Sequence, residues 1–224
     1  MIKAIVTDIE GTTSSIDFVH QSLFPYARAH MRAFLRKHAG DDRVQHLLAD
    51  VEREAHETLS LDQAADVLEQ WMTEDRKLTP LKALQGMVWK QGYEAGELKG
   101  HVYADTAPAL RQWHASGKQL YVYSSGSVEA QQLIFRHSDA GDLTPLFAGY
   151  FDTRIGAKRE AQAYRRIVEQ LALPANEVLF LSDIGAELDA AHEAGMQTCQ
   201  LLRDDKAVPA PAHTQVRSFV EVRV

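Results

Sequence analysis

The apolar and polar residues of this chain follow two different spacings. Residues 2–7 (IKAIVT) form a short run of apolar, mostly β-branched residues, which predicts a buried strand. From about residue 20 to residue 98 the apolar positions recur with helical spacing, and no convincing strand interrupts them. After Val102, helical patterns and short apolar runs alternate to the end of the chain. The pattern therefore predicts a helical segment inserted into an α/β domain.

The segment after Val102 predicts four further strands, each preceded by a helix. Strands joined by helices favour a parallel sheet covered on both faces, so we expect an α/β fold with a doubly wound parallel sheet. Because the first strand belongs to this sheet, residues 1–16 and 100–224 form the predicted core domain, and residues 17–99 form the all-helical insert. The strands are expected over residues 118–125, 149–153, 177–183 and 197–202, and the helices over 107–117, 128–138, 159–173 and 187–195.

Composition and charge exclude several classes of protein. The formal net charge of -7 over 224 residues argues against binding nucleic acid through a basic surface. No run of about 18 apolar residues predicts a membrane-spanning helix, and no basic segment followed by an apolar one predicts a signal peptide. The single cysteine, Cys199, excludes an internal disulfide and a multi-thiolate metal site. We expect a cytoplasmic monomer with no nucleic-acid or membrane partner.

Polar residues follow three of the predicted strands. The first strand ends at Asp8, the second at Ser124 and Ser125, and a later one at Asp183. Lys158 lies in the loop RIGAKRE, just before a predicted helix. Ligands of open α/β sheets bind beyond the carboxyl ends of the strands, so parallel strands would bring these groups together.

This set of side chains suits phosphoryl transfer. Carboxylate oxygens favour Mg²⁺, and a lysine with hydroxyls and the N–H of Gly126 suits a phosphate. Mg²⁺ and Lys158 would offset the repulsion between the carboxylates and a phosphate dianion. Asp8 is then the candidate nucleophile, forming an aspartyl-phosphate, and Glu10 the candidate general acid and base.

Glu187 has two interpretations. It lies one helical turn after Asp183 and Ile184, and its carboxylate is a candidate ligand for the same metal, directly or through water. Alternatively, it is an acid favoured at a helix N-terminus by the helix dipole. The spacing alone does not decide between them.

The four segments together carry a family resemblance. DIEGT, the strand ending at Ser124, Lys158 and the strand ending at Asp183 resemble the four ordered motifs of the haloacid dehalogenase-like phosphohydrolase superfamily, and the helical insert resembles its cap of the first type. More narrowly, DIEGTTSSI, YVYSSGSVEAQ, FDTRIGAKRE and LKALQGMVWKQGYEAGELKG resemble the enolase-phosphatases (acireductone synthases) of methionine salvage.

This resemblance implies a substrate, a cofactor and a role for each residue. The family enolises 2,3-diketo-5-methylthiopentyl-1-phosphate and then removes its phosphate to give an acireductone, using Mg²⁺. The superfamily usually has Asp as the second acid of the first motif, whereas Glu10 matches the enolase-phosphatases, and we expect Glu10 to serve enolisation as well as phosphoester cleavage. The implied roles are nucleophile and metal ligand for Asp8, acid/base and metal ligand through its carbonyl for Glu10, phosphate binding for Ser124, Ser125 and Gly126, charge neutralisation for Lys158, and metal ligand for Asp183.

Two alternatives remain at this stage. One is a different small-molecule phosphohydrolase or a phosphomutase on the same scaffold, because the cap sets substrate choice. The other is a non-catalytic receiver-type domain, although the acceptor would then lie on a later strand and the large insert would be absent. The cap residues expected to face substrate are Phe18, His20, Gln85 and Trp89.

Overall fold

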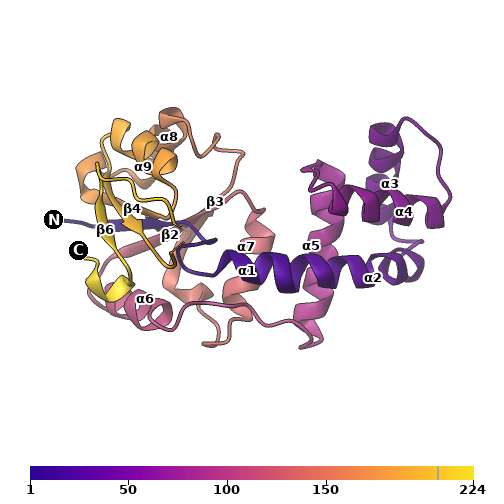
Figure 1. The fold of residues 1–224 in the computed structure, drawn as a ribbon, viewed down its shortest axis with the longest axis horizontal. Coiled ribbons are helices and arrows are strands. Elements are labelled where there is room, and N and C mark those ends of the chain that lie inside the picture. The colour runs from indigo at the N-terminus through magenta and orange to yellow at the C-terminus, as the bar shows by residue number, and fades with distance from the viewer. Residues whose placement is uncertain (206) are drawn as a thin grey trace. The chain divides into compact units, whose positions relative to one another are not determined.

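The computed structural model describes residues 1–205 and 207–224 and contains two compact units (Figure 1). The core unit consists of Met1–Ile16 and Lys99–Val224, and the cap unit consists of Asp17–Leu98. The cap unit is thus an insertion that leaves the core after its first strand. Residue 99 belongs to the core unit, whereas the sequence pattern assigned it to the insert.

The core unit is built on one sheet of six parallel strands in the order β3-β2-β1-β4-β5-β6. This confirms the expected α/β fold with a parallel sheet. All four residues of β1 are buried, as expected for a central strand covered on both faces. The strands are β1 (Ala4–Thr7), β2 (Gln119–Tyr123), β3 (Phe147–Phe151), β4 (Val178–Ser182), β5 (Gln197–Leu201) and β6 (Thr214–Val216).

Strand β6 was missed by the sequence pattern, which ended the sheet at β5. It is three residues long and pairs with β5 through Cys199 and Thr214 at one end and Leu201 and Val216 at the other. Only Val216 of β6 is buried. A single buried residue carries no alternation, so this edge strand had no periodic signal.

Helices cover both faces of the sheet. In Figure 1, α8 and α9 lie above the sheet and α6 lies below it. Tyr164 and Ile167 of α8 and Leu188 of α9 pack with Val6 and Phe180 in one buried cluster beneath these two helices. The helices are α6 (Thr106–Ala115), α7 (Val128–Arg136), α8 (Ala161–Leu171) and α9 (Gly185–Glu193), with short 3-10 turns at Thr144–Leu146, Ala175–Glu177 and Phe219–Glu221.

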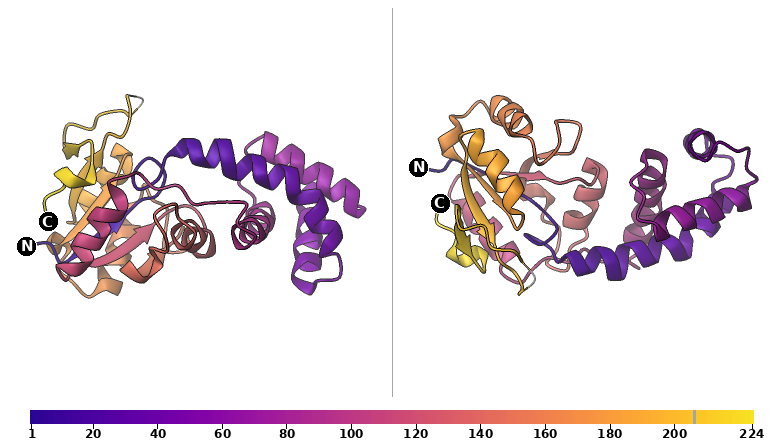
Figure 2. Two further views of the ribbon diagram at one scale, coloured as in Figure 1. Left: turned by 90° about the horizontal axis from the view of Figure 1, so that it is seen from below. Right: turned by 45° about the horizontal axis from the view of Figure 1, so that its top comes forward.

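The cap unit, residues 17–98, is fully described, and all of its regular elements are helices joined by short loops. Its first helical run begins at Ile16, earlier than the pattern indicated, and Figure 2 shows this indigo segment coiling without interruption into α2. Met31, Leu68, Trp71 and Leu84 form part of its own buried core. The elements are α1 (Ile16–Phe18), a π-helical turn η1 (Val19–Leu23), α2 (Phe24–Lys37), α3 (Asp42–Ala55), α4 (Leu61–Thr73) and α5 (Thr79–Glu94).

None of the helices in the described part of the chain combines the length and apolar character needed to cross a bilayer. The longest, α5, has 16 residues and carries lysines and a glutamate. A bilayer-spanning helix needs about 20 predominantly apolar residues.

Candidate active site

The first strand delivers Asp8 into a tight turn. The carbonyl of Ile9 accepts hydrogen bonds from the backbone N–H groups of Thr12, Thr13 and Ser14 at 3.2, 3.0 and 2.9 Å. The Thr13 hydroxyl donates to the Asp8 carbonyl at 3.2 Å. Asp8 itself is only 3% exposed. The two threonines that follow it therefore belong to the turn, and Thr13 holds the backbone of the candidate nucleophile.

Gly11 lets this turn approach the end of β4. Its φ of +74° lies in the left-handed region that favours glycine. A Cβ atom at this position would lie 2.4 Å from Oδ2 of Asp183. The structure therefore brings Asp183 directly against the turn that carries Asp8 and Glu10.

Lys158 is the cation of the site. Its Nζ lies 2.7 Å from Oδ1 of Asp8 and 2.7 Å from Oε2 of Glu187. Burial would lower the pKa of the Lys158 ammonium, but these two carboxylates outweigh burial and raise it above its ordinary value. Lys158 therefore stays charged and links Asp8, which follows β1, to Glu187 in the first turn of α9.

Two tyrosines that the sequence pattern did not single out hold the Lys158 loop. The Tyr164 hydroxyl donates to the carbonyl of Lys158 at 2.7 Å, and the Tyr123 hydroxyl donates to the carbonyl of Gly156 at 2.9 Å. Both tyrosines are fully buried. Their positions read as core residues of a helix and a strand, so no sequence signal marked their hydroxyls.

Glu187 lies in the first turn of α9 and faces the site. The Ser182 hydroxyl donates to its Oε2 at 2.9 Å, and the same oxygen contacts Lys158. Burial, followed by the nearby charge of Asp8, raises the pKa of Glu187 to about 6. Metal ligation by Glu187 stays a prediction, since the contacts of its Oε2 are with Ser182 and Lys158.

The end of β2 supplies the hydroxyls. Ser124 is buried, and its hydroxyl donates to Oε2 of Glu10 at 3.4 Å and accepts from the N–H of Gly126 at 3.1 Å. Ser125 is exposed. The Ser127 hydroxyl accepts from the N–H of Ala130 and so caps α7.

Gln131 is a further residue that the sequence pattern missed. It is 1% exposed, and its Nε2 donates to the carbonyls of Gly126 at 2.8 Å and Phe151 at 2.9 Å. A glutamine at a helix position gives no indication from spacing that it faces a loop. Its two hydrogen bonds fix the loop after Ser124 against the end of β3.

The carboxylates around Lys158 repel one another. Burial and the charge of Asp8 raise the pKa of Glu10, and the same two causes raise the pKa of Asp183 to about 7. Asp8, Glu10, Asp183 and Glu187 are therefore electrostatic neighbours, and the single charge of Lys158 does not balance them. A site of this kind is suited to a divalent cation.

The donor set fits Mg²⁺ held by few protein ligands. Oδ1 of Asp183 is buried and has no hydrogen-bond partner among the described residues, which is costly for a carboxylate unless a cation binds it. Those residues contain no cluster of three or more His, Cys, Asp or Glu side chains arranged around one metal position. Mg²⁺ commonly keeps several waters and binds through one or two carboxylates plus substrate phosphate, which agrees with Asp8 and Asp183.

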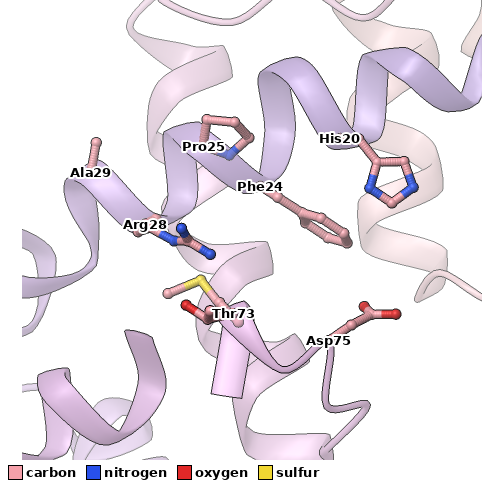
Figure 3. A pocket seen from close by; sticks show the side chains of 8 residues that line it. His20, Phe24, Pro25, Arg28, Ala29, Thr73 and Asp75 are labelled. Carbon is pink, nitrogen blue, oxygen red and sulfur yellow. The ribbon is translucent and has the colours of Figure 1, made fainter. Parts of the chain in front are cut away.

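The cap unit contains a separate pocket of about 520 Å³ (Figure 3). Of the cap residues expected to face substrate, only His20 is among the described residues that line it. The Trp89 indole instead donates to the carbonyl of Leu23 at 2.8 Å, and Gln85 is buried. The lining residues are His20, Phe24, Pro25, Arg28, Ala29, Met72, Thr73 and Asp75.

Comparisons with known proteins agree with this geometry. The family model of haloacid dehalogenase-like hydrolases matches residues 2–195. The chain is 56% identical to the Enolase-phosphatase E1 of Pseudomonas aeruginosa (strain UCBPP-PA14) over 100% of this chain and 99% of that protein. It is 55% identical to the Enolase-phosphatase E1 of Methylococcus capsulatus, over 100% of this chain and 98% of that protein.

Solved structures share the fold. The UTR4 protein of Saccharomyces cerevisiae superposes with a TM-score of 0.84 at 32% identity, covering 99% of this chain and 100% of that chain. CbbY from Rhodobacter sphaeroides, solved in complex with phosphate, has a TM-score of 0.64 at 17% identity and covers 99% of this chain and 96% of that chain. The second similarity concerns the fold alone.

Proposed function

The chain belongs to the haloacid dehalogenase-like hydrolases, among the enolase-phosphatases, and we propose that it converts 2,3-diketo-5-methylthiopentyl-1-phosphate into an acireductone and inorganic phosphate. The observation that carries this proposal is the convergence of Asp8, Glu10, Lys158 and Asp183 at one edge of the sheet. Relatives that span the whole chain at more than half identity bear the enolase-phosphatase name, which supports the choice of substrate.

We propose that Asp8 and Asp183 hold Mg²⁺ with the main-chain carbonyl of Glu10. The buried, unpartnered oxygen of Asp183 supports this assignment. When bound, the cation neutralises charge on the phosphate oxygens and on the carboxylates around them. Lys158 adds a fixed positive charge on the side of Asp8, where the phosphate must approach.

The phosphate is transferred to Asp8 and then to water. A carboxylate oxygen of Asp8 forms a bond to phosphorus while the bond between phosphorus and the substrate oxygen breaks. Glu10 donates a proton to that leaving oxygen. Water then attacks the aspartyl-phosphate and gives a proton to Glu10, and the bond between Asp8 and phosphorus breaks to release inorganic phosphate. Glu10 passes its proton to solvent, which restores both carboxylates. Ser124, Ser125 and the N–H of Gly126 bind the phosphate oxygens.

Enolisation precedes this transfer. The ionised Glu10 takes a proton from the carbon that bears the phosphate ester, and water gives a proton to the oxygen of the neighbouring carbonyl. Glu10 is then protonated and ready to donate to the leaving oxygen. We assign Glu10 to this proton movement because its carboxylate is held by the Ser124 hydroxyl beside Asp8. A carboxylate that takes a proton from carbon and later gives one to oxygen serves both steps with one side chain.

Incubation with the diketone phosphate and Mg²⁺ tests the proposal. We expect an enol chromophore to rise and decay ahead of the release of inorganic phosphate. Phosphate release without the chromophore would favour the alternative of a different phosphohydrolase. A single stoichiometric burst of the aryl alcohol from an aryl phosphate, without continuing release of phosphate, would instead favour a receiver-type domain, because the phosphate stays on its aspartate.

We also propose that the protein acts as a cytoplasmic monomer on this small-molecule phosphate ester. The net charge of -7 and the lack of a membrane-spanning helix among the described residues agree with this proposal. Light scattering coupled to size exclusion tests the monomer, since the chain mass is 25.1 kDa.

A further inference from the structure

We propose that Arg203 is a positioning residue that holds the turn carrying Glu10 through the carbonyl of Thr12. This inference rests on the proposed function, because it concerns how the phosphatase chemistry is aligned. Arg203 follows β5, far along the chain from the first motif, and its Nε donates to the Thr12 carbonyl at 2.9 Å.

The turn needs such external support. Three of its backbone N–H groups donate to the carbonyl of Ile9, and the N–H of Gly11 donates to the carbonyl of Ser14. The Thr12 and Thr13 carbonyls accept instead from groups outside the turn. The Thr13 carbonyl accepts from the N–H of Tyr103 at 3.0 Å and from the Thr106 hydroxyl at 3.1 Å. For the Thr12 carbonyl, Arg203 is the donor among the described residues. The tilt of the peptide between Thr12 and Thr13 therefore depends on this guanidinium.

Arg203 is itself held rigidly. Its side chain is 6% exposed, and one terminal nitrogen donates to both carboxylate oxygens of Asp105 at 2.9 and 2.7 Å. The guanidinium carbon lies 4.4 Å from the ring centre of Tyr103 and 4.7 Å from that of Phe219. The backbone N–H of Phe219 also donates to Asp105. Because these contacts fix the guanidinium, the Thr12 carbonyl that it binds is fixed as well.

The consequence for the site follows from the length of the turn. Thr12 lies two residues after Glu10 and one after Gly11, whose backbone is in contact with the Asp183 carboxylate. A small shift of the Thr12 carbonyl would move both the Glu10 carboxylate and the gap in which Asp183 sits. Loss of a group that orients catalytic side chains costs ~10- to 100-fold in activity.

A purely structural role is the competing explanation, and stability alone does not separate the two. Buried ion pairs are weak contributors to stability, but removal of one partner leaves a buried charge and is destabilising. The test therefore needs a control that weakens the same cluster without touching the turn. Trp113 is 4% exposed and packs at 5.2 Å against Phe219, so W113F is that control.

The experiment measures kcat, KM and melting temperature on p-nitrophenyl phosphate with Mg²⁺ for wild type, R203M, R203K and W113F. We expect R203M to lower kcat by ~10- to 100-fold with little change in KM, R203K to recover part of that loss, and W113F to lower the melting temperature with kcat unchanged. If R203M does not fold, R203K decides, because it keeps the charge but cannot contact Asp105 and Thr12 together.

Wild-type kcat in R203K and R203M, or an equal loss of kcat in W113F, would overturn the inference. A wild-type protein that hydrolyses the aryl phosphate but leaves the diketone phosphate unchanged would reject the proposed function instead. In that case the comparison of the Arg203 variants still stands, so the two failures are distinguishable.

Discussion

Gly11 and Asp183 are in such close contact that no side chain fits between them. A Cβ atom on Gly11 would lie 2.4 Å from Oδ2 and 2.6 Å from Cγ of Asp183, well inside contact distance. Gly11 lies in the turn after β1 and Asp183 directly follows β4, and these two strands are hydrogen-bonded neighbours in the sheet. Their contact sets how close the carboxylates of Asp8 and Asp183 come to one another.

Replacing Gly11 by alanine is therefore expected to displace Asp183. We predict a loss of activity of about 100-fold, the usual cost of misplacing a catalytic group by about 1 Å. The matched control is G117A, because Gly117 has a similar φ of +83° but a Cβ there meets nothing within 4 Å. G117A should lose about 1 kcal/mol in the free energy of unfolding, and G11A should lose more because its Cβ also displaces Asp183, but only G11A should lose activity. Equal activity in the two variants would contradict this prediction.

Asp8→Asn should abolish turnover while preserving the fold. Asparagine matches the shape of Asp8 but provides no anionic oxygen to attack phosphorus. Lys158 keeps its second partner, Glu187, in this variant, so its charge remains compensated. Phosphate release and circular dichroism provide the measurement. Surviving turnover would remove Asp8 as the nucleophile.

Glu10→Asp separates the two chemical steps. The shorter side chain withdraws the carboxylate by one methylene from the position where the Ser124 hydroxyl holds it. We expect the rate of enol formation to fall, measured by the chromophore before phosphate appears. Slower dephosphorylation with a normal rate of enol formation would show that Glu10 does not serve enolisation.

Glu187→Gln distinguishes the two interpretations of that residue. Its Oε2 already contacts Lys158 and accepts from Ser182, so we expect the variant to lower kcat through Lys158 and to leave the Mg²⁺ concentration at half-maximal activity unchanged. Titration of activity with Mg²⁺ is the measurement. A several-fold rise in that concentration would instead place Glu187 among the metal ligands.

The raised pKa of Asp183 predicts that the stability of the metal-free protein depends on pH. Its pKa is raised from 3.8 to about 7 by burial and by Asp8, so the folded state binds the proton more tightly than the unfolded state. The free energy of unfolding should therefore fall as pH rises from about 4 to about 7 and level off above. We expect D183N to show a shallower fall and to be more stable at pH 8 without metal. Urea unfolding at several pH values tests this.

Added Mg²⁺ should make wild type more stable than D183N, the reverse of the order expected without metal. A cation that binds the folded state raises the melting temperature of wild type by mass action. D183N lacks the unpartnered carboxylate oxygen and should gain much less. Equal stabilisation of both proteins by Mg²⁺ would argue against Asp183 as a metal ligand.

Much of this site could be predicted from local patterns. The apolar run before Asp8, the helical insert and the alternation of strands and helices are short-range signals, and parallel topology then places strand ends at one edge. Lys158 was predicted from its loop position before a helix, and the structure places it 2.7 Å from Asp8. The family resemblance, not the spacing, supplied the substrate.

The tertiary structure alone decided which groups touch. The contact of Gly11 with Asp183, the shared oxygen of Glu187 between Lys158 and Ser182, and the bond from Arg203 to Thr12 join residues far apart in the sequence. The periodicity of apolar residues indicates which face of a helix or strand a residue occupies, but it gives no information on contacts with residues far away in the sequence. These contacts follow from the packing of β1, β4 and β5 side by side, which only the folded chain determines.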